Sequence, residues 1–347
     1  MPVYEIDPLH DPNWTTLVES HPGSSIFHTR EWLDALRRTY KYKPRAFTTS
    51  APGSVLSNGI VFCQVNSWLT GSRLVSLPFS DHCDPLVESP DDLEALLSAV
   101  RQEAAGPFIY AEIRPRSISL EAQSNFKPST QYHLHVLDLH PSLDEVYSHL
   151  HKNGIQRMIR RADRERVVVD QGRSETILQE FYKLMLLTRR RHKLPPQPLA
   201  WFRNVIECCG SRVTIYVARV DNRPIASIFM LRHKRSLVYK YGGSDESFHN
   251  LGAILRLLWQ AIQDGKSEQL LELDLGRSDQ DNEGLTRFKG HLGAARSPLQ
   301  YWRSSGACAR GRDRSEGLAS WTAQHFLTRL PDRLFRLAGE LLYRHGG

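Results

Sequence analysis

The sequence predicts a mixed α/β protein of two packed units, and three observations support this class. The chain has 347 residues, about twice the size of an ordinary domain. Stretches with the period of strands are interspersed with stretches that have the period of helices. A polar stretch with prolines at positions 115 and 128 separates the two units, as a linker would. We therefore predict domains at residues 1–130 and 131–303, followed by a basic, amphipathic helical tail at 304–347.

The first unit is predicted from apolar periodicity and turn residues. Its elements are a helix at 25–38, two strands within 58–77, a helix at 91–105 and a strand at 108–113. The two strands meet at a turn that contains Gly71. A loop at 78–85 has a proline at each end and carries Asp81 and His82, so we expect it to hold these side chains rigidly.

The second unit begins with a strand at 132–139 and a helix that opens on the S-x-x-E spacing of a capping box, Ser142 to Glu145. A strand at 167–170 and a helix at 174–192 follow. Three antiparallel strands are then predicted at 213–220, 225–231 and 237–241. The last elements are a helix at 250–264 that ends at Gly265, a strand at 271–275 that stops at Gly276, a short helix at 283–289 and a strand at 299–302.

Composition limits the class of protein. Hydrophobic residues make up 40% and charged residues 24%, the balance of a folded protein with a sizeable core. No apolar run approaches the roughly 20 residues of a membrane-spanning helix, and the N-terminus lacks the apolar core of a secretory signal. Five scattered cysteines without a C-x-x-C pair predict reduced thiols and no metal site. We expect a cytoplasmic protein, with peripheral contact to the inner membrane face left open.

The excess positive charge is concentrated in one stretch. The formal net charge is +7, and between Lys152 and Lys193 twelve basic residues stand against five acidic ones. If one helix continues that far, four arginines share a face: Arg157, Arg160, Arg161 and Arg164. We expect Arg160 and Arg161 to bind the phosphates of a donor or of an anionic acceptor. The alternative is a solvated helix face.

The order of elements after Ser174 resembles the N-acetyltransferase (GNAT) fold: a helix, a three-stranded meander, then a helix, a strand, a helix and a strand. Residues 273–278, 282–285 and 287–294 resemble the closing signature of the Fem-type transferases and of the related GNAT or BioF2-like acyltransferases. Residues 25–32, 77–81 and 137–139 are also similar to that superfamily. The resemblance spans residues 22–303 and implies two tandem GNAT-like domains.

In the Fem group an amino acid passes from aminoacyl-tRNA to a peptidoglycan precursor peptide. The lysine of the family's closing Phe-Lys pair lies in the transfer site, which implies that role for Phe288 and Lys289. This sequence departs from the patterns of its relatives in two places. The acyl-CoA loop of ordinary GNAT enzymes, Q/R-x-x-G-x-G/A, reads H-N-L-G-A-I here at residues 249–254, and the coiled-coil insertion of some Fem enzymes is absent. Both acyl-CoA and aminoacyl-tRNA therefore stay open as the donor.

Acyl transfer to an amine needs an acceptor for the proton and positive charge where the carbonyl oxygen becomes an oxyanion. We expect Lys289 to supply that charge; the alternative is a solvated lysine at a helix end. Asp279 could accept a proton, and Arg277 and Ser278 could bind substrate at the end of a strand. The alternative for these three residues is a turn whose side chains only satisfy backbone groups.

Other candidates lie outside the closing signature. Tyr241 and the tyrosine two residues before it alternate on a strand, so both are expected on one side, and Tyr241 is the favoured catalytic residue because two glycines follow it. Trp32, Asp81 and His82 belong to the first unit, which in the resembling family helps to hold the acceptor. Trp32 could equally be a core residue. His135 is interpreted as structural.

The tail carries an apolar stripe with arginines between its members: Phe326, Leu330, Leu334, Leu337 and Leu341. We expect the tail to dock on the first unit through this stripe. The alternative is a helix that lies on an anionic membrane surface.

These features predict an acyltransferase that passes an acyl or aminoacyl group to an amine or hydroxyl of a cell-envelope or polysaccharide precursor. One alternative is an aminoacyl-tRNA-dependent transferase that builds peptidoglycan bridges. The other is a non-catalytic protein that binds RNA or a membrane surface. The expected partner is an anionic, phosphorylated or lipid-linked substrate, with tRNA as a further possibility and no stable protein partner.

Overall fold

The computed structural model describes residues 1–121, 125–306 and 330–346, and they form two compact units. Unit 1 contains Met1–Gln131, the end of strand β12 (Ala295–Ser305) from Leu299, and the last helix from Leu337. Unit 2 contains Tyr132–Pro298 and the last helix up to Arg336. The predicted second domain ran to residue 303. Its last residues belong to unit 1 instead, because β12 pairs there with β5 (Tyr110–Ile113).

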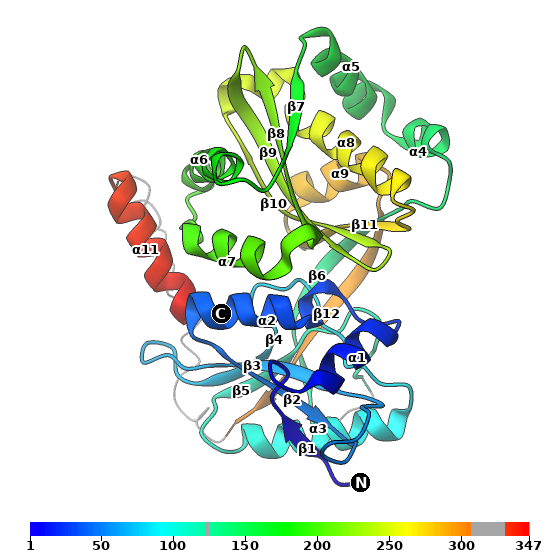
Figure 1. The fold of residues 1–347 in the computed structure, drawn as a ribbon, viewed down its shortest axis with the longest axis vertical. Coiled ribbons are helices and arrows are strands. Elements are labelled where there is room, and N and C mark those ends of the chain that lie inside the picture. Colours follow the sequence, from blue (N-terminus) through cyan, green and yellow to red (C-terminus); the bar gives the residue numbers. More distant parts are fainter. Residues whose placement is uncertain (122–124, 307–329, 347) are drawn as a thin grey trace. The chain divides into compact units, whose positions relative to one another are not determined.

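Unit 1 contains strands in the order β1-β2-β3-β4-β5-β12 (Figure 1). Neighbouring strands are antiparallel except for β4 and β5, which are parallel. The other strands are β1 (Tyr4–Ile6), β2 (Lys43–Thr48), β3 (Ile60–Val65) and β4 (Arg73–Ser76). The helices are α1 (Pro12–Ser20), the short η1 (Ile26–His28), α2 (Arg30–Tyr40) and α3 (Pro90–Ala104).

Helices α2 and α3 lie on opposite sides of the unit 1 strands (Figure 1). The α3 side buries Phe47 and Phe62 of the sheet against leucines such as Leu96. On α2, Trp32 is completely buried and its ring meets the edge of Phe27 at 5.1 Å. The structure therefore assigns Trp32 to the core of unit 1, not to a binding surface.

Unit 2 contains strands in the order β6-β11-β10-β9-β8-β7. Only β10 and β11 pair in parallel. The strands are β6 (Lys127–Asp138), β7 (Val168–Gly172), β8 (Val213–Val220), β9 (Arg223–His233), β10 (Ser236–Ser244) and β11 (Glu272–Asp279). The helical elements are α4 (Leu143–His149), the π-helical turn η2 (Lys152–Gln156), α5 (Arg157–Arg164), α6 (Glu175–Arg191), α7 (Leu199–Cys209), η3 (Gly210–Arg212), η4 (Glu246–Leu251), α8 (Ala253–Ser267) and α9 (Glu283–His291).

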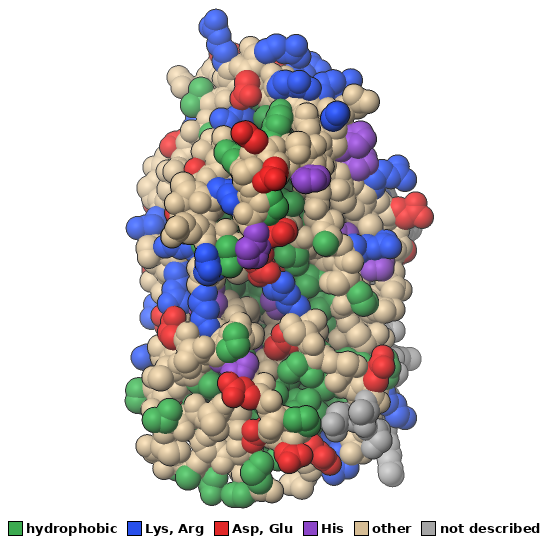
Figure 2. All heavy atoms as spheres, turned by 90° about the vertical axis from the view of Figure 1, so that its right-hand side faces the viewer, with side chains coloured by type: hydrophobic (Ala, Val, Ile, Leu, Met, Phe, Trp, Pro, Cys, Tyr) green, Lys and Arg blue, Asp and Glu red, His purple; other side chains and the backbone are tan. Residues whose placement is uncertain are grey.

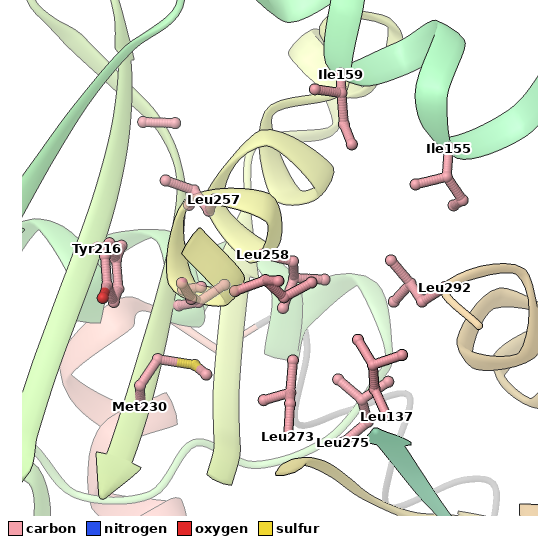
Figure 3. Packing of buried hydrophobic residues seen from close by; sticks show 14 of the residues in the cluster. Leu137, Ile155, Ile159, Tyr216, Met230, Leu257, Leu258, Leu273, Leu275 and Leu292 are labelled. Carbon is pink, nitrogen blue, oxygen red and sulfur yellow. The ribbon is translucent and has the colours of Figure 1, made fainter. Parts of the chain in front are cut away.

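The main core of unit 2 lies between the sheet and α8. Leucines of α8, including Leu257 and Leu258, pack on Met230 of β9 and Leu273 of β11 (Figure 3). Isoleucines 155 and 159, from η2 and α5, join the same cluster. Side chains on the other face of β9, such as Phe229, meet aromatic rings of α6 and α7. Unit 2 thus has a sheet covered on both faces.

The structure confirms the predicted meander as β8, β9 and β10, and the predicted capping box, in which Ser142 and Glu145 bond each other's backbone N–H. Two ends that were predicted at glycines are wrong. Helix α8 continues through Gly265 to Ser267, because Gly265 does not adopt the positive φ of a helix-ending glycine. Strand β11 continues past Gly276 to Asp279, since the glycine forms an irregularity within the strand instead of ending it.

Several elements were not predicted. Strands β1 and β2 and helices α1 and α7 gave no clear pattern in the sequence, and β6 begins at Lys127, inside the predicted linker. A short strand such as β1, with three residues, offers too few positions for periodicity to distinguish it from a loop. No helix among the described residues is long and apolar enough to cross a membrane.

The last helix is α11 (Asp332–His345), and it docks through a face that the sequence analysis did not predict. Phe335 and Gly339 are buried, whereas Leu334, Leu337 and Leu341 of the predicted stripe are exposed. Phe326, which would begin that stripe, lies outside the described residues. In unit 1 the Tyr42 hydroxyl donates to the Tyr343 carbonyl at 2.6 Å, close to the end of α11. From Leu337 onward, α11 packs with unit 1, as predicted for the tail, whereas the predicted docking face was wrong.

Candidate active site

Strands β10 and β11 separate partway along their length. Their parallel pairing covers only Ser236 to Val238 on β10 and Glu272 to Asp274 on β11. Beyond this point β10 has a bulge, and the pairing of β11 with β6 becomes irregular after Asp274. Backbone groups of β11 beyond Asp274 are therefore available to side chains from other elements.

Asp274 and Gly276 fix the irregularity in β11. Gly276 has a φ of 72°, a conformation that favours glycine. The Asp274 carboxylate is buried, and its Oδ1 accepts a hydrogen bond from the Gly276 N–H at 2.7 Å. Because the side chain holds the backbone in this turn, two successive carbonyl groups of β11 point toward helix α9.

Lys289 of α9 binds those two carbonyl groups. Its side chain is only 3% exposed, and Nζ donates to the Gly276 oxygen at 2.9 Å and to the Arg277 oxygen at 2.8 Å. The Asn282 side chain caps the start of α9 by accepting from the Leu285 N–H. Lys289 is therefore not the solvated lysine of the alternative interpretation. It is a buried cation at the point where β10 and β11 separate.

His135 of β6 lies close enough to Lys289 to feel its charge. The ring is 1% exposed, and neither ring nitrogen has a hydrogen-bond partner among the described residues. Burial, followed by the positive charge of Lys289, lowers the pKa of His135 to about 4. His135 is thus a neutral imidazole at pH 7, with two unpartnered nitrogens beside a buried ammonium group.

Ser278 lies on the same face of the sheet as His135. It pairs with His133 in the antiparallel register, and His135 is two positions further along that strand. The Ser278 side chain is buried, and its hydroxyl has no hydrogen-bond partner among the described residues. His135 was predicted to be only structural. Its position on the strand that pairs with the closing signature was the signal that could have identified it.

A cavity of about 400 Å³ lies beside helix α9. Phe288, the residue before Lys289, is one wall, and Met158 of α5 is another. The remaining wall comes from the start of β9, the end of β10, η4 and the start of α8: Ile225, Ala226, Ser244, Asp245, Phe248, His249, Gly252, Ala253, Ile254 and Leu255. Most of these side chains are apolar, so the cavity suits the apolar part of a small ligand.

Two polar side chains of the cavity bind each other. The Ser244 hydroxyl lies 2.9 Å from His249 Nε2, and burial, followed by the charge of Arg191, lowers the pKa of His249. Ser244 is also fixed through its backbone, because its N–H donates to the Thr188 hydroxyl at 2.8 Å. Neither Ser244 nor His249 was a candidate in the sequence analysis.

Helix α5 covers the N-terminus of α8. Gly252, the residue before α8, has a φ of 72°, and a Cβ atom there would lie 2.6 Å from the carbonyl oxygen of Met158. Helix N-termini bind phosphate through N–H groups that the chain leaves open. Here the backbone of α5 lies directly against that position.

The four arginines of α5 share one face, as predicted. The helix begins at Arg157 and ends at Arg164, and its other face buries Ile159 and Ala162. Arg160 is exposed, and Arg161 lies 3.8 Å from the carboxylate of Glu165. Figure 2 shows several Lys and Arg side chains at the top of the view, the end at which Figure 1 draws α5.

Tyr241 lies on the opposite face of the sheet from Lys289. A bulge at Lys240 reverses the alternation, so Tyr239 packs on the α8 side while Tyr241 contacts Phe202 and Phe229. The Tyr241 hydroxyl accepts a hydrogen bond from Trp201 Nε1 at 2.9 Å. The prediction that both tyrosines face one side was wrong, because it assumed an unbroken strand. Tyr241 belongs to the aromatic core between the sheet and α7.

Asp279 and Arg277 also lie on the face away from His135. Arg277 pairs in register with Leu134 and its guanidinium lies over the Tyr132 ring, 4.1 Å from the centroid. Asp279 is exposed at the end of β11. The structure therefore brings Lys289, Phe288 and Ser278 to one face and separates them from Arg277 and Asp279.

In unit 1 the loop that carries Asp81 and His82 is anchored at several points. The Tyr301 hydroxyl donates to the Asp81 carbonyl at 2.6 Å, and Arg114 Nη1 donates to the carbonyl groups of Leu77 and Ser80. His82 is buried, with its ring against Phe27 of η1. The loop is fixed as expected, and of its two candidate residues Asp81 is partly exposed whereas His82 is buried. Among the described residues, no group of three His, Cys, Asp or Glu side chains could hold a metal ion.

Comparison with known proteins identifies the fold. A family model described as an acetyltransferase (GNAT) domain matches residues 150–290. A crystal structure of FemX is similar over 88% of this chain and 98% of its own, with a TM-score of 0.71 and 13% identity. A tandem GNAT protein from the clavulanic acid biosynthesis pathway matches over 88% of this chain and 98% of its own, with a TM-score of 0.55 and 11% identity. The chain has the tandem GNAT fold that the sequence predicted.

A curated relative agrees with the predicted resemblance. The UDP-N-acetylmuramoylpentapeptide-lysine N(6)-alanyltransferase of Weissella viridescens is 24% identical over 226 residues, which cover 63% of this chain. The match spans 62% of the length of that relative. The resemblance to Fem-type and GNAT-fold transferases is thus confirmed.

Proposed function

We propose that this protein transfers an aminoacyl group from charged tRNA to an amine of a cell-envelope precursor. The observation that carries the proposal is the cluster at the end of the β10–β11 pairing. There the buried ammonium of Lys289 is bound by two backbone carbonyl groups of β11, beside the neutral ring of His135. An acyltransferase needs a fixed cation near a developing oxyanion and a group that can accept a proton.

The residues of this cluster supply both needs. The acceptor amine attacks the carbonyl carbon of the aminoacyl ester, and negative charge develops on the carbonyl oxygen. The positive charge of Lys289 stabilises that oxygen, in a site from which burial excludes water. The amine loses a proton, for which His135 and the Ser278 hydroxyl are the nearby unpartnered groups. The ester bond then breaks, and the 3′ hydroxyl of the tRNA takes up a proton as it leaves.

Two observations favour charged tRNA over acyl-CoA as the donor. The residues before α8 lack the first and last positions of the acyl-CoA loop. In addition, Met158 lies against Gly252 where that loop would present its N–H groups to a pyrophosphate. The cavity beside Phe288 remains suited to an apolar amino-acid side chain. The arginine face of α5 is suited to phosphates of a nucleic acid or of a phosphorylated acceptor.

The acceptor class comes from the curated relative, whose name describes alanyl transfer to a lysine amine of a UDP-linked muramoyl pentapeptide. We extend to this chain only the chemical class, a primary amine on an anionic envelope precursor. The protein is expected to work in the cytoplasm, where charged tRNA and nucleotide-linked precursors are made.

Donor screening with the purified full-length chain tests this function. Aminoacyl-tRNAs and acyl-CoAs are offered separately with a UDP-linked muramoyl pentapeptide, and the acceptor is weighed by mass spectrometry. The expected product is heavier by one aminoacyl group and forms only from charged tRNA. Transfer from acyl-CoA alone would contradict the donor assignment. Binding of tRNA without transfer to any amine acceptor would instead favour the non-catalytic alternative, for which the arginine face is the supporting feature.

A further inference from the structure

The end of α11 and one loop of unit 1 together expose an apolar surface that no part of the proposed reaction uses. Trp68 lies in the β3–β4 loop and is 83% exposed. On α11, Leu337 is 54% and Leu341 is 63% exposed. The His345 ring, one turn after Leu341, lies 5.6 Å from the Trp68 ring, so the helix face and the loop are continuous. We call these residues the Trp68 surface.

Hydrogen bonds hold the β3–β4 loop in place, so Trp68 is exposed on an ordered loop. Arg73 Nη2 donates to the His345 carbonyl at 2.7 Å, and the Thr70 hydroxyl donates to the same oxygen at 2.9 Å. Ser67 accepts from the Thr70 N–H and lies 3.0 Å from His345 Nδ1. These bonds cap the end of α11, where a cation such as Arg73 is favoured by the helix dipole.

Helix α11 is apolar on two faces, and only one of them is packed. Phe335 and Gly339 lie on the buried face. Leu337 and Leu341 lie on the other, and Leu334 continues the same row one turn earlier. A surface helix usually buries its apolar residues against the protein and turns polar residues outward. Here leucines occupy the outward side.

The charges beside this row favour one kind of partner. Arg333 and Arg344 are exposed on the flank of the leucine row. Helix α11 as a whole carries three arginines against two acidic residues. An apolar row flanked by arginines, with an exposed tryptophan at its end, is the pattern of a segment that lies in the headgroup region of a bilayer. Anionic lipids complement the arginines.

We propose that the Trp68 surface docks on an anionic membrane leaflet, with Trp68 and the leucine row at the headgroup boundary. This goes beyond the transfer reaction and does not depend on which donor the protein uses. Docking would hold the protein at the surface where a lipid-linked acceptor lies.

Sedimentation of the full-length protein with lipid vesicles tests the proposal. Vesicles that contain phosphatidylglycerol are compared with vesicles of phosphatidylcholine alone, at low and at high salt. We expect binding to the anionic vesicles that weakens as salt screens the arginines. The double variant Leu337→Ser, Leu341→Ser should bind the anionic vesicles at least about tenfold more weakly. Its melting temperature should be unchanged, because both side chains already face water. Arg344→Glu should weaken binding through charge alone.

Val55→Ser is the matched control. Val55 is 75% exposed in unit 1, but it lies in the β2–β3 loop, at the other end of β3 from Trp68. This variant should bind vesicles as the unmodified protein does. Failure of the unmodified protein to bind anionic vesicles would overturn the proposal, as would full binding by the double variant. So would a dimer of the unmodified protein, seen by light scattering, that becomes monomeric in the double variant, since the surface would then join two copies.

Discussion

In the proposed reaction, Lys289 has a structural and a chemical task at the same position. Two of its bonds join α9 to the β11 backbone, and its charge lies beside the unpartnered ring of His135. A surface lysine could be replaced without consequence. A buried ammonium that satisfies two carbonyl groups cannot, because its removal leaves those oxygens without a donor.

Replacing Lys289 with methionine should therefore affect two measurements. We expect turnover to fall by about 10²-fold or more, the usual effect of removing one oxyanion donor. The free energy of unfolding should also fall, by about 1–3 kcal/mol, because buried carbonyl groups are left unsatisfied. Rates are compared at a temperature where both proteins are folded, which unfolding curves establish.

Lys289→Arg is the control for this change, since it keeps the positive charge and the hydrogen-bond donors. It should recover part of the stability and more turnover than Lys289→Met. Turnover of the methionine variant at the level of the unmodified protein would remove Lys289 from the mechanism.

His28 predicts how stability depends on pH. It is completely buried, accepts from the Ser25 N–H at Nδ1 and lies 2.8 Å from the Asp84 carbonyl through Nε2. Burial lowers the pKa of His28 to about 4 from an ordinary value of 6.5. Between these values the unfolded chain binds a proton that the folded protein does not. The free energy of unfolding should therefore fall as pH drops from about 6.5 towards 4.

Chemical denaturation at pH 7 and pH 5 measures this effect. The variant His28→Gln should be less stable at pH 7 but should lose less stability between the two pH values, because it binds about one proton fewer on unfolding. His135 contributes with the same sign. An equal loss in the variant and the unmodified protein would contradict the assignment of a neutral buried His28.

At the scale of elements, close contact between α5 and α8 decides how the cavity is built. Gly252 is the point of contact, and both its positive φ and the nearby Met158 carbonyl exclude a side chain. Gly252→Ala should lower the free energy of unfolding by about 1 kcal/mol or more, because the conformation is strained and the helices must move apart. Thermal unfolding measures it.

Gly265→Ala is the matched control in the same helix. A Cβ there meets its nearest neighbour, Leu270, at an ordinary contact distance of 3.6 Å. This substitution should be neutral or should stabilise the protein by about 0.5–1 kcal/mol, the usual gain when alanine replaces glycine inside a helix. If Gly252→Ala were tolerated as well as Gly265→Ala, α5 would not lie against α8 in solution.

The arginine face of α5 gives a prediction for binding. Changing Arg160 and Arg161 to glutamine should raise the KM for the phosphorylated substrate and reduce its dependence on salt, because fewer charges take part. Arg203→Gln is the control, since Arg203 lies on α7 and pairs with Glu175. Steady-state kinetics at two ionic strengths compare the three proteins. An unchanged KM at low ionic strength would mean that these arginines only form a solvated helix face and do not bind the substrate.

At the scale of the whole molecule, the docked C-terminal helix is part of the folded structure. Phe335 is completely buried, and the Arg190 guanidinium lies 4.5 Å from its ring. We expect Phe335→Ala to lower the free energy of unfolding by about 3–5 kcal/mol, as for other buried phenylalanines. Leu341→Ala on the exposed face should change it by about 0.5 kcal/mol or less. Equal effects in denaturant unfolding would mean that the helix is not docked through Phe335.

Much of the fold could be predicted from the sequence because it depends on local patterns. The meander β8–β10 follows from alternation and turn residues, and the start of α4 from the spacing of Ser142 and Glu145. The segment around Phe288 and Lys289 was recognised by its resemblance to the closing signature of the Fem-type transferases, whose residues are adjacent in the chain. These features require only neighbours within a few positions.

Tertiary structure alone decided which side chains meet. A single bulge at Lys240 moved Tyr241 to the opposite face from Tyr239, because one extra residue reverses the alternation of a strand. His135 became a candidate only through β6–β11 pairing, which joins residues far apart in the sequence. Packing decided which face of α11 is buried, since its sequence is apolar on both sides. Periodicity shows that a face is apolar, and packing decides whether that face is buried.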